Sequence, residues 1–314
     1  MNEDRIDVSI LMLTYYHEKY VAKALDSVLA QKTDLRYEIV VGDDASGDRT
    51  PEILREYAEK YPDIVKPVLR TENLGSCKNG LDASARTKGK YMAYLEGDDY
   101  WLDPYKMQKQ YDFLEENTEY FACCGKCLIV DENGTPDYTQ SPQFAENKKV
   151  FTLQDYFTTW NVPGQIGTLM RRNNLGFEYA DAYEVHRNVG DKTDALIFLS
   201  QGPIYCFNEI FSAYRHVTSK DGHNHFSQHY ANPYRDYDMF LYPCRLEAWG
   251  KRRLGLAPDV RLGPRRDYRF CRFVEQTVKD PSIKRLKCLG EMIAASRQPA
   301  KYSWLVLKTL IGME

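Results

Sequence analysis

The fold of this chain is decided by the stretch Lys90-Tyr91-Met92-Ala93-Tyr94-Leu95-Glu96-Gly97-Asp98-Asp99-Tyr100. Its first half is a short apolar run that follows Gly89, which indicates a buried strand. The strand ends in Gly97 and two adjacent carboxylates. Ligands of an open α/β sheet bind beyond the carboxyl ends of the strands, and neighbouring carboxylates are costly to hold together unless a cation neutralises them. The pair therefore predicts a hard divalent cation that bridges to a nucleotide diphosphate. A helix cap before Trp101 is the alternative.

The sequence on the N-terminal side of this strand alternates between strand and helix patterns. Continuous apolar runs predict strands at 8–14, 37–42 and 64–70, as expected of parallel strands covered on both faces. Between them, apolar residues at helical spacing predict helices that begin near Val21 and Ile53, and a further helix at 77–88. This order predicts a doubly wound sheet with right-handed crossovers.

Four motifs in this region occur in the order found in family 2 glycosyltransferases, which the chain resembles. They are Ser9-Ile10-Leu11-Met12-Leu13-Thr14-Tyr15-Tyr16 with the helix up to Gln31, Val41-Gly42-Asp43-Asp44-Ala45-Ser46-Gly47-Asp48-Arg49-Thr50, Asn73-Leu74-Gly75 with Asn79-Gly80, and 85–91 leading into Glu96-Gly97-Asp98-Asp99. A second stretch, with Gly190-Asp191, Gly202-Pro203-Ile204 and 209–216, resembles the acceptor half of the same catalytic domain. The resemblance covers roughly residues 5 to 220.

The resemblance implies a GT-A fold: a Rossmann-like, mostly parallel sheet flanked by helices. It also implies a nucleotide-diphosphate sugar as donor, Mn²⁺ or Mg²⁺ as cofactor, and inversion at the anomeric carbon. Thr14 and Tyr16 match the positions that line the nucleotide pocket, and Asp44 matches the carboxylate that hydrogen-bonds the base. Asp98 is expected to face the ribose or the metal, and Asp99 to hold the metal against the diphosphate. For Asp44, and for Asp43 beside it, a turn and helix cap is the alternative.

Inverting transfer also needs a carboxylate that takes the proton from the acceptor hydroxyl. Asp191 matches the position of this base in the family, although the family often has Glu-Asp where this chain has Gly190-Asp191. Asp194 is the second candidate, and Asp191 as the N-cap of a helix is the structural alternative. Arg215 and His216 follow an apolar strand and are candidate diphosphate contacts. A structural arginine and a solvated histidine remain open for these two.

Two further groups of residues invite a metal interpretation. Cys124 and Cys127 form a Cys-x-x-Cys, but no second pair follows at zinc-finger spacing, so we expect a core role within a strand at 120–130. His223, His225 and His229 lie in the polar segment 220–230, for which we expect a substrate-gating loop rather than a metal cluster. The segment 131–148 is expected to be a surface loop that shapes the acceptor pocket.

The chain of 314 residues carries a net charge of −3 that is unevenly distributed. From Arg245 onward there are 16 Lys and Arg against 7 Asp and Glu, so that this part carries +9 and the remainder −12. We predict a catalytic domain at 1–230 and a basic, helical C-terminal region at 231–314. Its apolar end, 302–311, is too short to span a membrane but suits a membrane surface. A solvated appendage or a homodimer contact is the alternative.

Other features bear on location and activity. The acidic start predicts no secretory signal, and eight Cys are expected as reduced thiols, so we predict a cytoplasmic protein, peripheral on the cytoplasmic face of the membrane. The acidic balance argues against nucleic acid. Because Gln-x-x-Arg-Trp, the mark of processive synthases of the family, is missing, we predict non-processive transfer of one sugar, with UDP as the favoured carrier. The acceptor is expected to be a glycan, with lipid-linked glycans included, in cell-surface polysaccharide assembly. The alternatives are a catalytically silent sugar-nucleotide-binding protein and a sugar nucleotidyltransferase.

Overall fold

The computed structural model describes residues 5–139, 148–216 and 232–310. The predicted loop with His223, His225 and His229 lies outside these residues, and so does the predicted domain boundary at residue 230. The described residues form two compact units. The first comprises 5–156, 161–180 and 194–216, and the second comprises 157–160, 181–193 and 232–310, in each case without the gaps given above.

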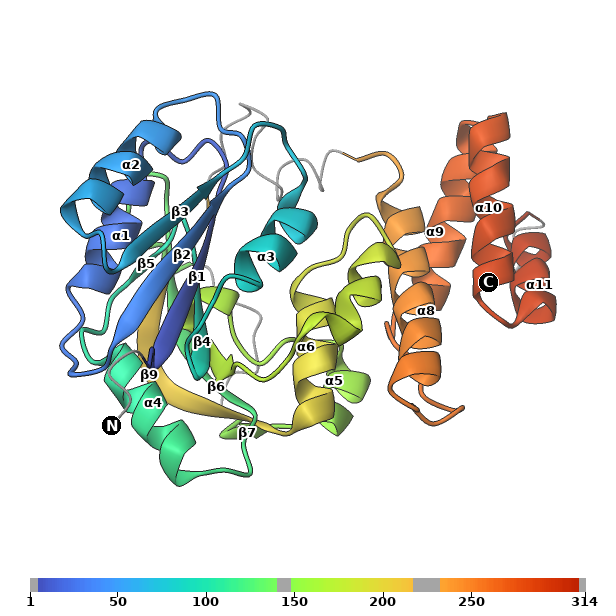
Figure 1. Ribbon diagram of the computed structural model, residues 1–314. Coiled ribbons are helices and arrows are strands. Elements are labelled where there is room, and N and C mark those ends of the chain that lie inside the picture. The colour runs from blue at the N-terminus through green and yellow to red at the C-terminus, as the bar shows by residue number, and fades with distance from the viewer. Residues whose placement is uncertain (1–4, 140–147, 217–231, 311–314) are drawn as a thin grey trace. The chain divides into compact units, whose positions relative to one another are not determined.

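The first unit is built on a nine-stranded sheet (Figure 1). Its first four strands are parallel and lie in the order β3-β2-β1-β4: β1 (Val8–Thr14), β2 (Tyr37–Asp43), β3 (Val65–Leu69) and β4 (Tyr91–Glu96). The path continues through β8 (Met170–Arg172), β6 (Ala122–Val130), β9 (Ile204–Arg215) and β5 (Tyr100–Trp101), and β7 (Val150–Phe151) also pairs with β9. β8 is antiparallel to both of its neighbours, whereas β6 and β9 are parallel. The predicted parallel arrangement therefore holds for the first four strands, and the rest of the sheet is mixed.

Helices follow the strands of this sheet as the sequence pattern predicts. α1 (Val21–Leu29) and α2 (Thr50–Lys60) cover one face, and α3 (Ser76–Ser84) lies on the opposite face (Figure 1). α4 (Lys106–Glu116) packs its Met107 and Leu114 into the same core as α1. The remaining elements are α5 (Leu153–Thr159), the short 3₁₀ segments η1 (Ile166–Thr168) and η2 (Phe177–Glu184), and α6 (Asp191–Gln201).

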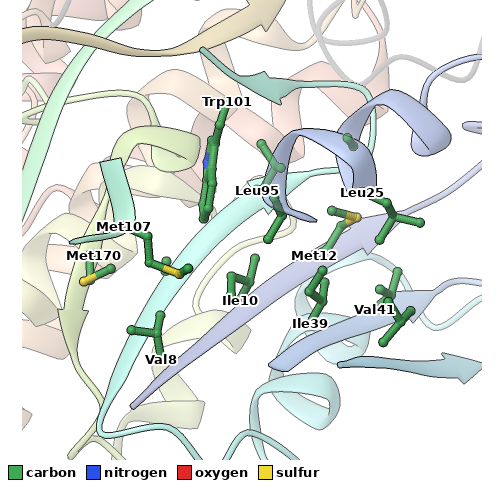
Figure 2. Close-up of a cluster of buried hydrophobic side chains, with 14 of the residues drawn as sticks. Val8, Ile10, Met12, Leu25, Ile39, Val41, Leu95, Trp101, Met107 and Met170 are labelled. Carbon is green, nitrogen blue, oxygen red and sulfur yellow. The ribbon is translucent and has the colours of Figure 1, made fainter. Parts of the chain in front are cut away.

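The core shows why β1 is apolar at most of its positions. Val8, Ile10 and Met12 point to the face covered by α1 and pack with Ile39, Val41 and Leu95, as Figure 2 shows. Leu11, on the opposite face, packs with Val40, Ala83 of α3 and Met92. Successive side chains of a strand alternate between faces, so a strand covered by helices on both faces is mostly apolar, and the buried Ser9 and Thr14 hydroxyls are hydrogen-bonded to Glu38 and Asp43.

The strand order creates a topological switch point. The chain runs from β1 outward to β2 and β3 and then returns to β4 on the other side of β1. The connections that leave the carboxyl ends of β1 and β4 therefore diverge, and open α/β sheets bind their ligands in the crevice formed there. Thr14, Asp43 and Glu96 are the last residues of β1, β2 and β4, so Tyr16, Asp44 and Asp98 follow strands that end at this edge of the sheet.

The second unit contains the C-terminal helices α8 (Arg235–Arg253), α9 (Arg266–Lys279), α10 (Ile283–Ala295) and α11 (Pro299–Leu310). Its core consists of Phe240, Cys244, Phe270, Phe273, Val274, Met292 and Tyr302. α11 is amphipathic: Tyr302 is buried, whereas Trp304 and Leu307 are 52% and 48% exposed. The predicted apolar tail is thus anchored by one face in its own unit. None of the described helices has the length and hydropathy needed for a membrane span.

Candidate active site

Two turns at the carboxyl ends of β1 and β2 are fastened to each other by side chains. The backbone N–H groups of Tyr16, His17 and Glu18 donate to Ser46 Oγ at 2.9 Å, Thr50 Oγ1 at 2.9 Å and Asp48 Oδ2 at 3.1 Å. Tyr16 and Ala45 have left-handed backbones with φ of 58° and 61°. Non-glycine residues adopt this conformation at a cost, and such strain concentrates at functional sites.

Three of the carboxyl and hydroxyl groups predicted here are buried and already hydrogen-bonded. Thr14 Oγ1 donates to Asp43 Oδ1 at 2.8 Å, and Asp43 also accepts from the hydroxyl and the N–H of Ser46. The Asp44 carboxylate accepts the N–H groups of Leu74 at 2.7 Å and Gly75 at 2.9 Å. These side chains hold the turns after β1 and β2 in place, whereas Tyr16 is 36% exposed.

The two adjacent carboxylates after β4 differ in their surroundings. Asp99 is 1% exposed and accepts hydrogen bonds from Gln165 Nε2 at 2.8 Å and from the Arg215 N–H at 2.7 Å. Burial, together with the neighbouring Asp98 carboxylate, raises the pKa of Asp99 well above its usual range. The Asp98 side chain is 25% exposed. Of the two, Asp98 therefore offers its carboxylate to the crevice, and Asp99 anchors the turn.

Arg215 supports the same turn from the end of β9. Its Nε donates to the Asp98 carbonyl at 2.8 Å, and its Nη1 donates to the carbonyls of Asp131 at 3.0 Å and Glu132 at 2.7 Å. The guanidinium also lies 4.5 Å from the centre of the Tyr20 ring, and the residue is 5% exposed. This geometry favours the structural alternative for Arg215 over a diphosphate contact.

His216, the other candidate diphosphate contact, lies just past β9. Its N–H donates to the Val130 carbonyl at 2.8 Å, and its ring meets Tyr214 edge-on at 4.7 Å. Burial lowers the pKa of His216 below its usual value. No hydrogen bond or ion pair joins His216 to Asp98 or Asp99 in the described part of the chain.

The carboxylates of this turn fit a hard divalent cation. Asp98 would supply oxygen ligands next to Asp99, whose pKa is raised by burial and, in addition, by the negative charge of Asp98. Within the residues described, no group of three or more His, Cys, Asp and Glu side chains is arranged to hold a metal. An ion here would therefore take most of its ligands from a bound diphosphate and from water, which is how Mg²⁺-type ions bind at nucleotide sites.

The two candidate bases lie on α6. Asp191 is exposed, begins the helix and belongs to the second unit, where the N–H of Thr193 donates to the carbonyl of Gly190 at 2.7 Å. Asp194 belongs to the first unit, where its charge contributes to raising the pKa of Cys77 and of Tyr94. The two carboxylates, only three positions apart in sequence, are thus assigned to different units.

The cysteine interpretation is confirmed. Cys123, Cys124 and Cys127 are buried on β6, and burial raises the pKa values of Cys123 and Cys127 to about 12. All eight cysteines are free thiols. A buried neutral thiol packs as a small apolar group, so these residues serve the core.

Sequence reasoning missed two residues at the Asp98–Asp99 turn. His17 Nε2 lies 3.9 Å from Asp98 Oδ2, and Gln165 holds Asp99. The signal for His17 was its position directly after β1, at the switch point. Gln165 carried none, because it precedes the single turn of η1, far along the chain from Asp99.

Comparison with known proteins agrees with this fold. The model of glycosyl transferase family 2 matches residues 9–175, more than half of the chain, so this chain belongs to that family. The putative teichuronic acid biosynthesis glycosyltransferase TuaG of Bacillus subtilis is 33% identical over 129 residues, which cover 41% of this chain and 50% of TuaG. This chain matches only part of its curated relatives: 50% of the length of TuaG, and 38% and 52% of the length of two others.

Solved structures show the same fold over nearly the whole chain. S. aureus TarS 1–349 in complex with UDP-GlcNAc has a TM-score of 0.64 at 16% identity, over 98% of this chain and 88% of that one. The mannosyltransferase PcManGT of Pyrobaculum calidifontis, in complex with GDP-Man and Mn²⁺, has a TM-score of 0.51 at 18% identity, over 99% and 88%. The predicted family and the predicted GT-A fold with a helical C-terminal region are confirmed.

Proposed function

We propose that this protein transfers a single sugar, with inversion, from a nucleotide-diphosphate sugar to a hydroxyl of a glycan acceptor in the assembly of a cell-surface polysaccharide. The observation that carries the proposal is the partly exposed Asp98 carboxylate at the switch point of the sheet, in a turn that Arg215 holds through Asp99 and the Asp98 carbonyl. UDP is the favoured carrier, in line with the UDP-GlcNAc bound by TarS. The polysaccharide role rests on the name of TuaG.

In this proposal Asp98 faces the diphosphate of the nucleotide sugar, and Asp99 positions Asp98 by anchoring the turn. Both oxygens of Asp99 accept N–H groups, so the Asp98 carboxylate is the better placed of the two to reach Mn²⁺ or Mg²⁺. The ion, when bound, stabilises the negative charge that develops on the leaving diphosphate. This modifies the sequence-based expectation that Asp99 holds the metal. The metal is supported by the Mn²⁺ in the complex of PcManGT.

The remaining donor contacts fall to the turns after β1 and β2. The Tyr16 ring offers a flat apolar face for the base, and Asp44 shapes the pocket edge through Leu74 and Gly75. Asp191 is proposed as the base that takes the proton of the acceptor hydroxyl. Its exposure on the first turn of α6 supports the role, with Asp194 as the second choice.

The helical unit suggests where the protein binds in the cell. On α10, Ile283 is 76% and Leu286 58% exposed, and Lys284 and Lys287 are exposed beside them. Apolar side chains alternating with lysines suit the interface of an anionic membrane. We propose peripheral binding to such a surface, on the cytoplasmic side, which suits a lipid-linked acceptor. A homodimer contact through the same side chains is the alternative.

Thermal unfolding with UDP or UDP-GlcNAc, in Mn²⁺ or EDTA, tests the donor site. A ligand that binds only the folded state raises the unfolding midpoint, by about 2.7 kcal/mol of stability at a concentration of 100 Kd. The wild type should respond to UDP more strongly with Mn²⁺ than with EDTA. Asp98→Asn should lose that difference, and the surface control Asp112→Asn should keep it.

Turnover is then measured as UDP release from UDP-GlcNAc. Asp191→Asn should keep the stabilisation by UDP and lose turnover. If it turns over normally and Asp194→Asn does not, the base is Asp194. A wild type that binds UDP but never releases it from any UDP-sugar, with a panel of glycans present, would favour the sugar-nucleotide-binding protein. A wild type that UDP fails to stabilise contradicts a UDP-sugar donor.

A further inference from the structure

His17 is the residue of the crevice to which the sequence assigned no role. It follows β1, on one side of the switch point, and Asp98 follows β4 on the other. The two side chains approach each other, with His17 Nε2 at 3.9 Å from Asp98 Oδ2, and both are partly exposed, at 19% and 25%. The Nε2 edge of the ring therefore faces the same space as the carboxylate proposed to meet the diphosphate side of the donor.

The position of the ring is tightly defined. A Cβ at Gly97 would lie 2.8 Å from His17 Nδ1 and 2.5 Å from Thr14 Cγ2, so a side chain at position 97 would displace the ring. The His17 backbone is held by Thr50 Oγ1. Nδ1 is buried and has no hydrogen-bond partner among the described residues. A buried polar atom without a partner costs free energy, and such an atom in a native site calls for an explanation.

In the described structure, the two residues that the sequence predicts as diphosphate contacts, Arg215 and His216, do not direct a side-chain hydrogen-bond donor to the Asp98 carboxylate. The Nε and Nη1 groups of Arg215 donate hydrogen bonds to three backbone carbonyls, and the residue is almost wholly buried. Between His216 and the Asp98–Asp99 turn, the described residues show no hydrogen bond or ion pair. His17 is a partly exposed side chain at this turn whose Nε2 lies near the Asp98 carboxylate.

We propose that His17 binds the diphosphate of the donor nucleotide through a hydrogen bond from its ring nitrogen Nε2. The inference rests on the proposed function, since it assumes a nucleotide diphosphate in this crevice. An imidazole N–H donates to a phosphoryl oxygen in either protonation state of the ring, provided that the neutral form carries its proton on Nε2. His17 then distinguishes a nucleoside diphosphate from the nucleoside alone, and it does so without a metal ion.

The test is isothermal titration of UDP and of uridine in EDTA, with GDP and guanosine in parallel. In the wild type, the diphosphate should bind more tightly than its nucleoside. His17→Ala should reduce this preference about tenfold, the effect of one hydrogen bond to a charged group, and should leave nucleoside affinity unchanged. His17→Asn, which retains an N–H donor, should keep more of the preference. His216→Ala is the matched control and should keep all of it.

The outcomes separate this inference from the function on which it rests. If neither diphosphate binds the wild type, the proposed function fails and the inference fails with it. If UDP or GDP binds the wild type and His17→Ala retains the full preference, only the role of His17 is refuted. Loss of the preference in His216→Ala instead would assign the contact to His216. Equal loss of nucleoside and diphosphate affinity in His17→Ala would refute a phosphate contact and indicate a structural role.

Discussion

A lysine buried against the Trp101 ring should make the stability of the protein depend on pH. Lys106, on the first turn of α4, is 0% exposed. Its Nζ donates to Gln110 Oε1 at 2.7 Å and lies 4.1 Å from the centre of the Trp101 ring. No ion pair between Lys106 and a carboxylate occurs in the described residues. Burial without a counter-charge lowers the pKa of Lys106 from 10.5 to about 7.

The size and sign of the effect follow from the difference between the two states. The unfolded chain keeps this lysine protonated up to a pKa of about 10.4, whereas the folded protein releases the proton near pH 7. Between these values the unfolded state binds more protons, so stability rises with pH. The slope approaches about 1.4 kcal/mol per pH unit. Between pH 7 and pH 9, Lys106 should add about 2 kcal/mol to the free energy of unfolding.

Lys106→Met keeps an unbranched side chain of similar length and removes the proton. The free energy of unfolding of the wild type and of Lys106→Met is measured with guanidinium chloride at pH 7, 8 and 9. From pH 7 to pH 9, we expect the wild type to gain about 2 kcal/mol relative to Lys106→Met. Lys109→Met is the control, because Asp103 and Glu209 raise the pKa of Lys109 and keep it charged throughout. The reasoning is refuted if the free energies of unfolding of the wild type and of Lys106→Met differ by the same amount at pH 7 and at pH 9.

Two further predictions concern the active site and the helical unit. Arg215→Lys should lose the planar fork that binds the Asp98, Asp131 and Glu132 carbonyls, costing about 1–3 kcal/mol of stability and weakening the Mn²⁺-dependent binding of UDP. Denaturant unfolding and calorimetric titration check both effects against the surface control Arg55→Lys, and unchanged UDP binding would contradict the positioning role. Ile283→Ser with Leu286→Ser should reduce co-flotation with anionic phosphatidylglycerol vesicles at least tenfold, since each buried apolar side chain is worth about 1.5–3 kcal/mol. The exposed Val278 of α9 supplies the control Val278→Ser, and equal flotation with neutral vesicles would contradict an anionic-membrane site.

The position of the candidate site could be predicted from the sequence. Asp98, Asp44 and Tyr16 each follow a strand whose apolar run is visible in the sequence, and their proposed roles come from the resemblance to the family. The position of a residue after a strand of a parallel sheet implies the edge at which it lies, and the order of four such strands was sufficient to bring these residues to one crevice.

The roles of individual side chains within that crevice required the structure. The adjacent Asp98 and Asp99 look equivalent in sequence, yet one is partly exposed and the other is enclosed by Gln165 and the backbone of Arg215. Those contacts join residues 66 and 116 positions apart. No local pattern encodes which distant donor will meet a given carboxylate, because that depends on how β5 and β9 pair.

The sequence by itself determined the layered α/β architecture, the family and the edge of the sheet that carries the site, because side-chain periodicity and strand ends are local properties of the chain. Only the tertiary structure decided the antiparallel insertion of β8, the structural use of Arg215 and the approach of His17 to Asp98. These features arise when segments distant in sequence compete for the same space and the same hydrogen-bond partners. Which side chains are buried and which hydrogen bonds they form therefore depends on the whole fold, because a buried polar group needs a hydrogen-bond partner from any part of the chain that packs against it.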